Sequence, residues 1–536
     1  MACPKCDIPH RSEELAQLVP SGANFGYDVL VYVGKALFLR HRTEQEVVAE
    51  LAVKNVRISS REASLLGMKF IVYLAIAQQQ HTASITADMQ LRGGFVCHLD
   101  STCEGGDPFL MSSIDSLSEI VLGNIKIPSE HKDHIVPFLQ SIKKDYGKPL
   151  ALVHDMSRGI IKAAEEVFPG VPDYICHFHF LRDIGIDYMG GEYDTIRTLL
   201  SKHQINGKLL THAKQIKGTI NWTSDLIDVL ATGLSNHPLP PASYQFLPAI
   251  NCYTYIQWAL QGKSDGQGYG FPFDHPYLTF ANRLRCLHAD MEKLSKTQLR
   301  GKWKDNMVYF KVIHILNPVM QDKALWRAVE ALEKKIPVFE KLRQAMRIAL
   351  PTGRQGLNDE GQKGNINTIE QRVKKFRGWL TSRKDYPQNQ DAKNMINQID
   401  KYWKKLFAEP IIVQTPTGTT HIQPQRTNNI LEQMFRHIKR ANRRKTGNAS
   451  SGRILRTMLA QTPLARNLSN PNYMKIMLAE KKSLEEVFAG ININTFRNEF
   501  SKARSMPGKI PAKLKALIAM TDYPEKLAEM MRKAAA

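Results

Sequence analysis

Acidic residues are in short supply in this chain. Lysine and arginine number 73 against 51 aspartate and glutamate, so the net charge is +22. The shortage is greatest between Glu409 and Glu480, where Glu432 is the only acidic residue. A folded protein with so much positive charge calls for a polyanionic partner, and we expect DNA or RNA. A membrane surface is disfavoured because the basic residues do not cluster beside an apolar anchor.

Long apolar runs and abundant cysteines are also missing. The best apolar run, Phe70–Ala77, is too short to span a bilayer. The first ten residues lack the basic and apolar regions of a secretory signal. Seven cysteines, an odd and thinly spread set, do not indicate a disulfide framework. We therefore expect a protein of a reducing compartment, cytoplasmic and associated with the nucleoid.

Length and one cysteine motif bear on the domain organisation. A chain of 536 residues is too long for one core, and about three domains are expected. The N-terminal region, 1–42, carries Cys3 and Cys6 at the C-x-x-C spacing, which is half of a zinc site. No second pair follows at finger or ribbon spacing, so a Zn²⁺ ligand set and a truncated remnant both stay open.

The next region, 43–92, is predicted to be helical. Thr43 and Glu46 have the spacing of a capping box, and Ser59 or Ser60 can cap a second helix. Two helices joined by a tight turn are the outline of a helix-turn-helix that reads DNA. Ordinary helical packing produces the same pattern, so both interpretations stay open.

A change of pattern at residue 93 predicts an α/β core. Apolar segments bounded by glycine and turn residues indicate strands, and amphipathic segments indicate helices. The predicted order is β-β-β-α-β-α-β, with strands at 93–102, 108–115, 118–127, 148–156 and 173–180, and helices at 129–147 (capped at Ser129) and 157–170. This alternation after an initial meander favours a mixed sheet, with the first part of the core at 93–190.

The remainder of the chain is predicted to be mostly helical. A helical insertion at 191–420 would separate the first part of the core from a second part at 421–470, and 471–536 would form a C-terminal helical region. The insertion contains Trp258, Trp303 and Trp326. Tryptophans in a helical region are commonly core residues, and only the family resemblance given below implies that an aromatic here stacks on a flipped base.

Two aspartates stand at the ends of predicted strands. Asp100 and Asp155 each follow an apolar segment, at the edge where a sheet presents ligands to solvent. Either one alone could be a turn residue or a helix cap. Together they could hold two carboxylates so close that a cation is needed between them, and oxygen-rich sites favour Mg²⁺ or Mn²⁺.

Glu432 has a structural and a functional interpretation. Asn429 and Glu432 have the form of a capping box, and Glu432 and Arg436 could form an ion pair one turn apart. Alternatively, Glu432 is the third carboxylate of a site in which two metals act on a phosphodiester. Leu431, Phe435 and Ile438 would then pack inward. The basic run beside it would bind DNA phosphates through Arg436, Lys439, Arg440, Arg443, Arg444 and Lys445.

These motifs resemble those of bacterial insertion-sequence transposases of the DDE type, in particular the Mutator-like branch. The matching segments are "HLDST" at Asp100, "LVHDMSRGI" at Asp155, "CHFH" at Cys176 and His179, and "NNILEQMFRHIKR" at Glu432. The resemblance covers about residues 20–480. It implies an RNase H-like α/β core with a large all-α insertion and helical N- and C-terminal regions.

The resemblance also implies a function and a site. Asp100, Asp155 and Glu432 would be the metal-binding DDE triad, with two Mg²⁺ or Mn²⁺ ions, in an enzyme that cleaves and transfers DNA strands at transposon ends. Cys176 and His179 match the C-x-x-H motif, but a buried cysteine and a packed histidine explain them equally well. A zinc site there would need two more ligands.

The implied partners are double-stranded DNA, at the transposon ends and at the target, and further copies of the chain in a homodimer or larger assembly. Two alternatives share the basic surface. One is an inactive transposase-derived protein that binds DNA as a regulator, and the other is an RNase H-like nuclease that cuts without joining.

Overall fold

The structure of the protein is a computed structural model that describes residues 12–232, 245–296, 307–349, 366–407, 409–448, 450–504, 514 and 517–535. Cys3, Cys6 and Trp303 lie outside these ranges. No helix within them is long and apolar enough to cross a membrane.

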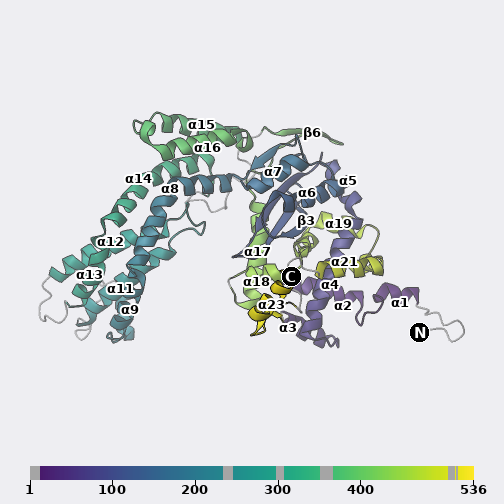
Figure 1. Cartoon of the computed structure of the whole chain (residues 1–536), viewed down its shortest axis with the longest axis horizontal. Coiled ribbons are helices and arrows are strands. Elements are labelled where there is room, and N and C mark those ends of the chain that lie inside the picture. The colour runs from purple at the N-terminus through teal and green to yellow at the C-terminus, as the bar shows by residue number, and fades with distance from the viewer. Residues whose placement is uncertain are drawn as a thin grey trace. The chain divides into compact units, whose positions relative to one another are not determined.

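The chain forms two compact units (Figure 1). The core unit comprises Met1–Asp173, Pro410–Pro424 and Asn428–Ala536, and the helical unit comprises Tyr174–Glu409 and Gln425–Thr427. The helical unit thus begins before residue 191, where the sequence placed the start of the insertion. That predicted boundary falls inside a long helix, α8 (His177–Lys202).

A five-stranded mixed sheet lies at the centre of the core unit, as the sequence predicted. The strands are β1 (Val96–Thr102), β2 (Phe109–Asp115), β3 (Ile120–Ile127), β4 (Ala151–His154) and β5 (Asp173–Ile175). Their order is β3-β2-β1-β4-β5. β2 is antiparallel to both β1 and β3, and β4 is parallel to β1.

The core unit also contains helices. They are α1 (Glu13–Leu18), α2 (Tyr27–Phe38), α3 (Glu44–Val53), α4 (Ser60–Gln80), α5 (Thr82–Leu91), α6 (Lys132–Tyr146), α7 (Arg158–Val167), α17 (Asn429–Thr446), α18 (Gly452–Thr457), η5 (Thr462–Ser469), α19 (Pro471–Leu478), α20 (Leu484–Ala489), α21 (Ile493–Arg504) and α23 (Tyr523–Ala535). A small hairpin, β6 (Ile411–Thr415) and β7 (Gly418–Ile422), completes the unit.

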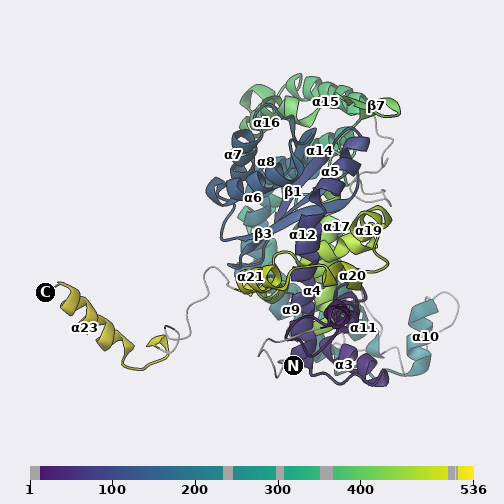
Figure 2. The same cartoon turned by 90° about the vertical axis from the view of Figure 1, so that its right-hand side faces the viewer.

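The two faces of the sheet are covered by different helices. α6 and α7 lie side by side along one face (Figures 1 and 2). Gly123 of β3 faces Phe138 and Ile142 of α6, so its register partner Ser113 belongs to the same face. Because side chains alternate along a strand, the next residue, Ser112, belongs to the opposite face. α17 and η5 pack on that opposite face, against β1 and β3.

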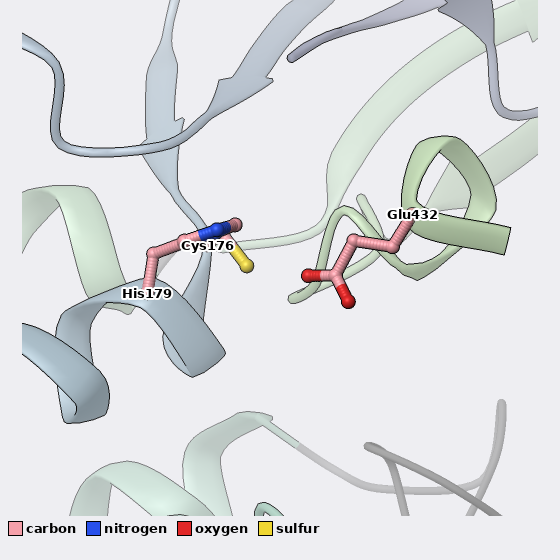
Figure 3. A group of neighbouring side chains, drawn as sticks. All are labelled: Cys176, His179 and Glu432. Carbon is pink, nitrogen blue, oxygen red and sulfur yellow. The ribbon is translucent and has the colours of Figure 1, made fainter. Parts of the chain in front are cut away.

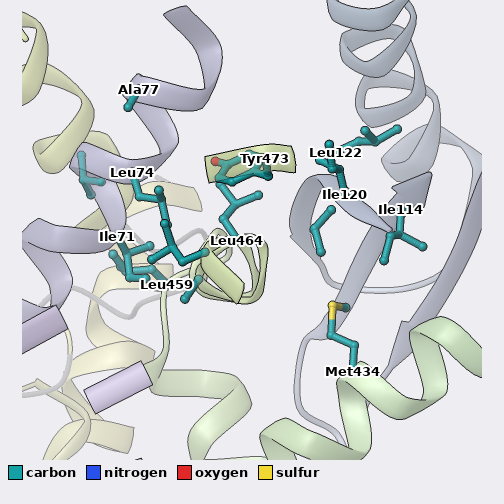
Figure 4. Packing of buried hydrophobic residues seen from close by; sticks show 14 of the residues in the cluster. Ile71, Leu74, Ala77, Ile114, Ile120, Leu122, Met434, Leu459, Leu464 and Tyr473 are labelled. Atoms are coloured by element: carbon teal, nitrogen blue, oxygen red, sulfur yellow. The ribbon is translucent and has the colours of Figure 1, made fainter. Parts of the chain in front are cut away.

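α4 is a central helix of the hydrophobic core, with eleven buried residues (Figure 4). Tyr73 stacks on Phe496 of α21 with ring centroids 4.1 Å apart. Gly34 lets α2 approach closely, since a Cβ there would lie 2.1 Å from the ring of Phe70. The predicted capping box of Thr43 and Glu46 is present at the start of α3, and Ser59 caps α4. A helix so deeply packed leaves mainly its first turn for a DNA groove, which weakens the helix-turn-helix interpretation.

Two predicted element boundaries were wrong. The helix expected to be capped at Ser129 begins at Lys132, with His131 as its N-cap. The fifth strand ends at Ile175, and "HFHF" begins α8 instead. The alternating "CHFHF" pattern suits a strand, but Phe180, Leu181 and Ile184 are buried at helical spacing, and the longer pattern prevails.

The described elements of the helical unit after β5 are helices. In addition to α8, they are α9 (Ile205–Lys217), α10 (Ser224–Thr232), α11 (Leu247–Gln261), η2 (Gly262–Ser264), α12 (Pro276–Lys296), α13 (Met307–Met320), α14 (Lys323–Met346), α15 (Ile366–Thr381), η4 (Tyr386–Gln388) and α16 (Gln390–Leu406). Lys335 joins three of them, because its Nζ lies 2.6 Å from Glu192 Oε1 of α8 and 2.7 Å from Asp391 Oδ2 of α16.

Candidate active site

The two predicted aspartates lie at the C-terminal ends of two neighbouring strands, β1 and β4. These strands pair in parallel with His98 opposite Val153, and the same register continued by two residues would bring Asp100 opposite Asp155. Asp100 is 5% exposed, at the C-terminal part of β1. Asp155 directly follows β4. Carboxylates at the ends of adjacent parallel strands are the arrangement that the sequence predicted for a shared cation.

Both aspartates belong to the face of the sheet that α17 covers. Asp100 pairs with Ser112, which the alternation assigns to that face, and Asp155 lies two residues beyond Val153, which pairs with His98. The carboxylates also have local contacts. Asp100 Oδ1 accepts from the N–H of Ser101 at 2.8 Å. Asp155 Oδ1 accepts from the N–H of Ser157 at 2.9 Å, so Asp155 also has the turn role that the sequence left open.

Asn428 attaches the start of α17 to β1. This residue is fully buried, and its Nδ2 donates to the carbonyl of Leu99 at 2.8 Å. Its Oδ1 therefore faces His98 Nδ1 at 2.9 Å, which assigns the ring proton to Nδ1. Burial lowers the pKa of His98 to about 4, so the ring is neutral at ordinary pH. The N-terminus of α17 is thus fixed beside Asp100.

Glu432 lies one turn along α17 from this anchor. Residues four apart share a helix face, so Glu432 lies on the face of α17 that carries Asn428. The proposed capping box is wrong, because the N-cap is Asn428 and α17 begins at Asn429. The i, i+4 ion pair with Arg436 is not formed among the described residues. Oε1 of Glu432 is buried and has no hydrogen-bond partner in the described part of the chain.

The buried, unpartnered Oε1 of Glu432 is the observation that fits a bound cation. A buried carboxylate oxygen without a partner is costly, and a metal ion or a proton is what stabilises one. If Asp100 and Asp155 also reached this oxygen, the three carboxylates would provide an all-oxygen donor set of the kind that suits Mg²⁺ or Mn²⁺.

The start of α8 carries a cysteine and a histidine, Cys176 and His179, both labelled in Figure 3. Among the described residues, no group of three metal-ligating side chains with ligand atoms within 4.8 Å of one another includes Asp100 or Asp155. The carboxylate triad as a metal site therefore stays a prediction.

The C-x-x-H motif occupies the start of α8. Cys176 is the N-cap and is buried. His177, which follows Cys176 in the motif, is held in place. Its N–H donates to the carbonyl of Arg426 at 2.8 Å, and its Nε2 lies 2.8 Å from the carbonyl of Leu406. Burial lowers the pKa of His177 to about 3. Residues 176 and 179 thus share a helix face on a firmly tethered first turn.

Glu130 is an acidic residue near this edge that sequence reasoning missed. It accepts a hydrogen bond from the hydroxyl of Ser101, next to Asp100. Its backbone lies against Gly159 in the first turn of α7, where a Cβ would come 1.7 Å from the Glu130 carbonyl oxygen. Its predicted place inside a surface helix concealed it, because that helix starts two residues later.

The basic run of α17 is exposed, with one exception. Leu431 and Phe435 are buried and Ile438 packs against the core, as predicted. The exposed members of the run are Arg436, Lys439, Arg440, Arg443 and Arg444. Lys445 is half-buried, and its Nζ donates to the carbonyl of Leu37 at 2.9 Å, so it tethers α17 to α2.

The described tryptophans of the predicted insertion have ordinary packing partners. Arg283 lies over the ring of Trp258 at 4.9 Å, and the ring is 39% exposed. Trp326 donates its indole N–H to the carbonyl of Val319 at 3.0 Å. Neither contact requires a nucleic-acid base.

No protein-family model and no curated protein matches this chain. The assignment of a function therefore depends on the residues and geometry of the site.

Proposed function

We propose that the chain is a DNA transposase of the DDE type, with Asp100, Asp155 and Glu432 as its catalytic carboxylates. The observation that carries the proposal is the buried, unpartnered Oε1 of Glu432 on a helix fixed to β1 beside Asp100. The sequence offers no other acid for this role between residues 410 and 479.

The order of the elements supports an RNase H-like core. Three strands, a helix, a strand, a helix and a strand follow one another from β1 to β5, and the sheet order is 3-2-1-4-5. The helical unit interrupts the core unit between β5 and α17. A long helical segment between the second aspartate and the glutamate is what the resemblance implies.

Each group has a role in such a reaction. Mg²⁺ or Mn²⁺ would activate water, or a DNA 3′-hydroxyl, and stabilise the charge of the leaving oxygen. Asp100 and Asp155 provide ligands from the rigid sheet, and Glu432 provides one from α17. Asn428 positions Glu432 through its two bonds to β1. The exposed arginines and lysines further along α17 would hold DNA phosphates.

The two alternatives remain distinguishable. A regulator that only binds DNA would tolerate loss of any of the three acids, and the intact set favours an enzyme. A nuclease that cuts without joining would use the same three acids. Only the products separate it from a transposase, because a transposase leaves the cut strand joined to target DNA.

The test is strand cleavage and joining by Glu432→Gln. The substrate is a plasmid that carries the coding sequence with its natural flanking DNA, incubated with purified protein and Mg²⁺ or Mn²⁺. We expect cleavage to fall more than about a hundredfold, since even the outer partners of metal ligands cost 10–100-fold. DNA binding should persist or strengthen, because a negative charge beside the phosphates is removed.

Glu525→Gln is the matched control, because Glu525 is an exposed glutamate in the first turn of α23. It should cleave as the wild type does. Wild-type cleavage by Glu432→Gln would refute the catalytic assignment. Cleavage without joined products in the wild type would favour the nuclease.

A further inference from the structure

The turn between α2 and α3 presents one histidine in a fixed geometry. Its arginines are engaged, since Arg40 and Arg42 lie 3.2 and 2.8 Å from the carboxylate of Glu50. His41 between them has φ of 54°, a left-handed conformation that is uncommon for a residue with a side chain. The N–H of Arg42 donates to the carbonyl of Ala36 at 3.0 Å, which holds the turn closed.

His41 faces a second histidine on the basic helix. The ring centroids of His41 and His437 lie 5.3 Å apart, and the rings are tilted by 54°. His437 is exposed, on the same helix as the DNA-binding run predicted from the sequence. The two rings thus bring the α2–α3 turn next to the surface that would hold DNA.

The charges that act on this pair are positive. Burial lowers the pKa of His41, and His437, Lys445 and Arg444 lower it further by repulsion. The acidic residues of α3 act on other groups. Glu46 is engaged by Thr43 in the capping box and pairs with Arg42 at 3.6 Å. Glu46 also attracts Arg444, and both Glu44 and Glu46 attract Lys445. A cluster of like charges is relieved by an anion, and phosphate is the anion that histidine and arginine bind together.

We propose that His41, His437 and Arg444 form a binding subsite for a backbone phosphate of DNA, and that this contact takes up a proton when DNA binds. The proposal rests on the DNA-binding part of the proposed function. Burial and repulsion lower the pKa of His41 in the free protein, whereas an adjacent phosphate favours the charged ring. DNA should therefore bind more tightly as the pH falls through the range in which His41 becomes charged in the complex.

The experiment measures duplex DNA binding by fluorescence anisotropy at pH 6 and pH 8, at one ionic strength. We expect the wild type to bind at least about threefold more tightly at pH 6, since one pKa unit on one histidine corresponds to tenfold in affinity. The variant His41→Gln with His437→Gln should lose most of this difference.

The matched control replaces another neighbouring pair in the core unit. His131 and His134 have ring centroids 6.5 Å apart at the start of α6. Their replacement by glutamine should leave the pH dependence intact. If the wild type and His41→Gln/His437→Gln bind DNA with equal pH dependence, the subsite is overturned. DNA binding by the wild type would in that case leave the DNA-binding part of the proposed function standing.

Two further outcomes also decide the matter. A wild type that does not bind DNA would overturn both this inference and the DNA-binding function. Inorganic phosphate could bind to the same side chains, so the DNA-binding measurement is repeated in phosphate and in chloride at equal ionic strength. Phosphate binding that requires both histidines, together with equal DNA affinity of the wild type and His41→Gln/His437→Gln at pH 6, would indicate a site for free phosphate and overturn the assignment to DNA.

Discussion

Replacing Asn428 by alanine tests whether this residue positions the catalytic glutamate. The substitution removes two buried hydrogen bonds, to His98 Nδ1 and to the Leu99 carbonyl. A buried polar group left without a partner costs ~1–3 kcal/mol, so the core unit should lose about 2–4 kcal/mol of stability. The start of α17 would also lose its attachment to β1. We expect strand cleavage to fall about 10- to 100-fold, as for other residues that orient metal ligands.

Asn467→Ala separates positioning from stability. Asn467 is also fully buried, and its side chain bonds the N–H and carbonyl of Val121 at 2.8 and 2.9 Å and Gln78 Oε1 at 3.0 Å. These bonds attach η5 to β3 instead of α17 to β1. Both variants should therefore lose similar stability, measured as Tm by calorimetry.

Cleavage is then measured well below both melting temperatures. Only Asn428→Ala should be impaired, and the loss should appear in kcat with DNA affinity unchanged. Equal cleavage by the two variants would refute the positioning role of Asn428.

Two further predictions concern charge. Arg443→Ala with Arg444→Ala should weaken binding to all DNA sequences and reduce the slope of log K against log salt by about 2, because each phosphate contact contributes about 0.9; an unchanged slope would count against phosphate contacts. Lowering the pH from 6.5 to about 4 should destabilise the fold. The pKa of His98 is 6.5 in the unfolded chain and about 4 in the folded chain, so the unfolded chain binds the proton over a range in which the folded chain does not. The loss from this one group approaches roughly 3 kcal/mol at the acid end. His98→Gln should therefore retain more of its Tm across this range, and parallel curves would contradict the assignment.

Local patterns in the sequence predicted much of the fold. The capping box at Thr43 needs only two residues three positions apart, and it is present. The strands up to β4 follow apolar segments bounded by turn residues, so their positions could be predicted. The inward positions of Leu431 and Phe435 follow from helical spacing.

Long-range contacts could not be predicted in this way. Asn428 bonds to β1 across more than 300 residues of sequence, and an asparagine before a helix indicates only a cap. The capping interpretation of Glu432 was also wrong. It required Asn429 as the N-cap, but α17 begins at Asn429 and its N-cap is Asn428. The sequence predicted that α4 is a helix but left open whether it reads DNA or packs in a core, because its burial is decided by partners as distant as Phe488 and Phe496.

The most direct test of the account is metal binding by Glu432→Gln. Free Mn²⁺ is measured by electron paramagnetic resonance during titration of the wild type, Glu432→Gln and the control Glu525→Gln. The account predicts that the wild type and Glu525→Gln bind Mn²⁺ equally, and that Glu432→Gln binds it much more weakly. Unchanged Mn²⁺ binding by Glu432→Gln would contradict the claim that this lone acid of the basic region is a metal ligand.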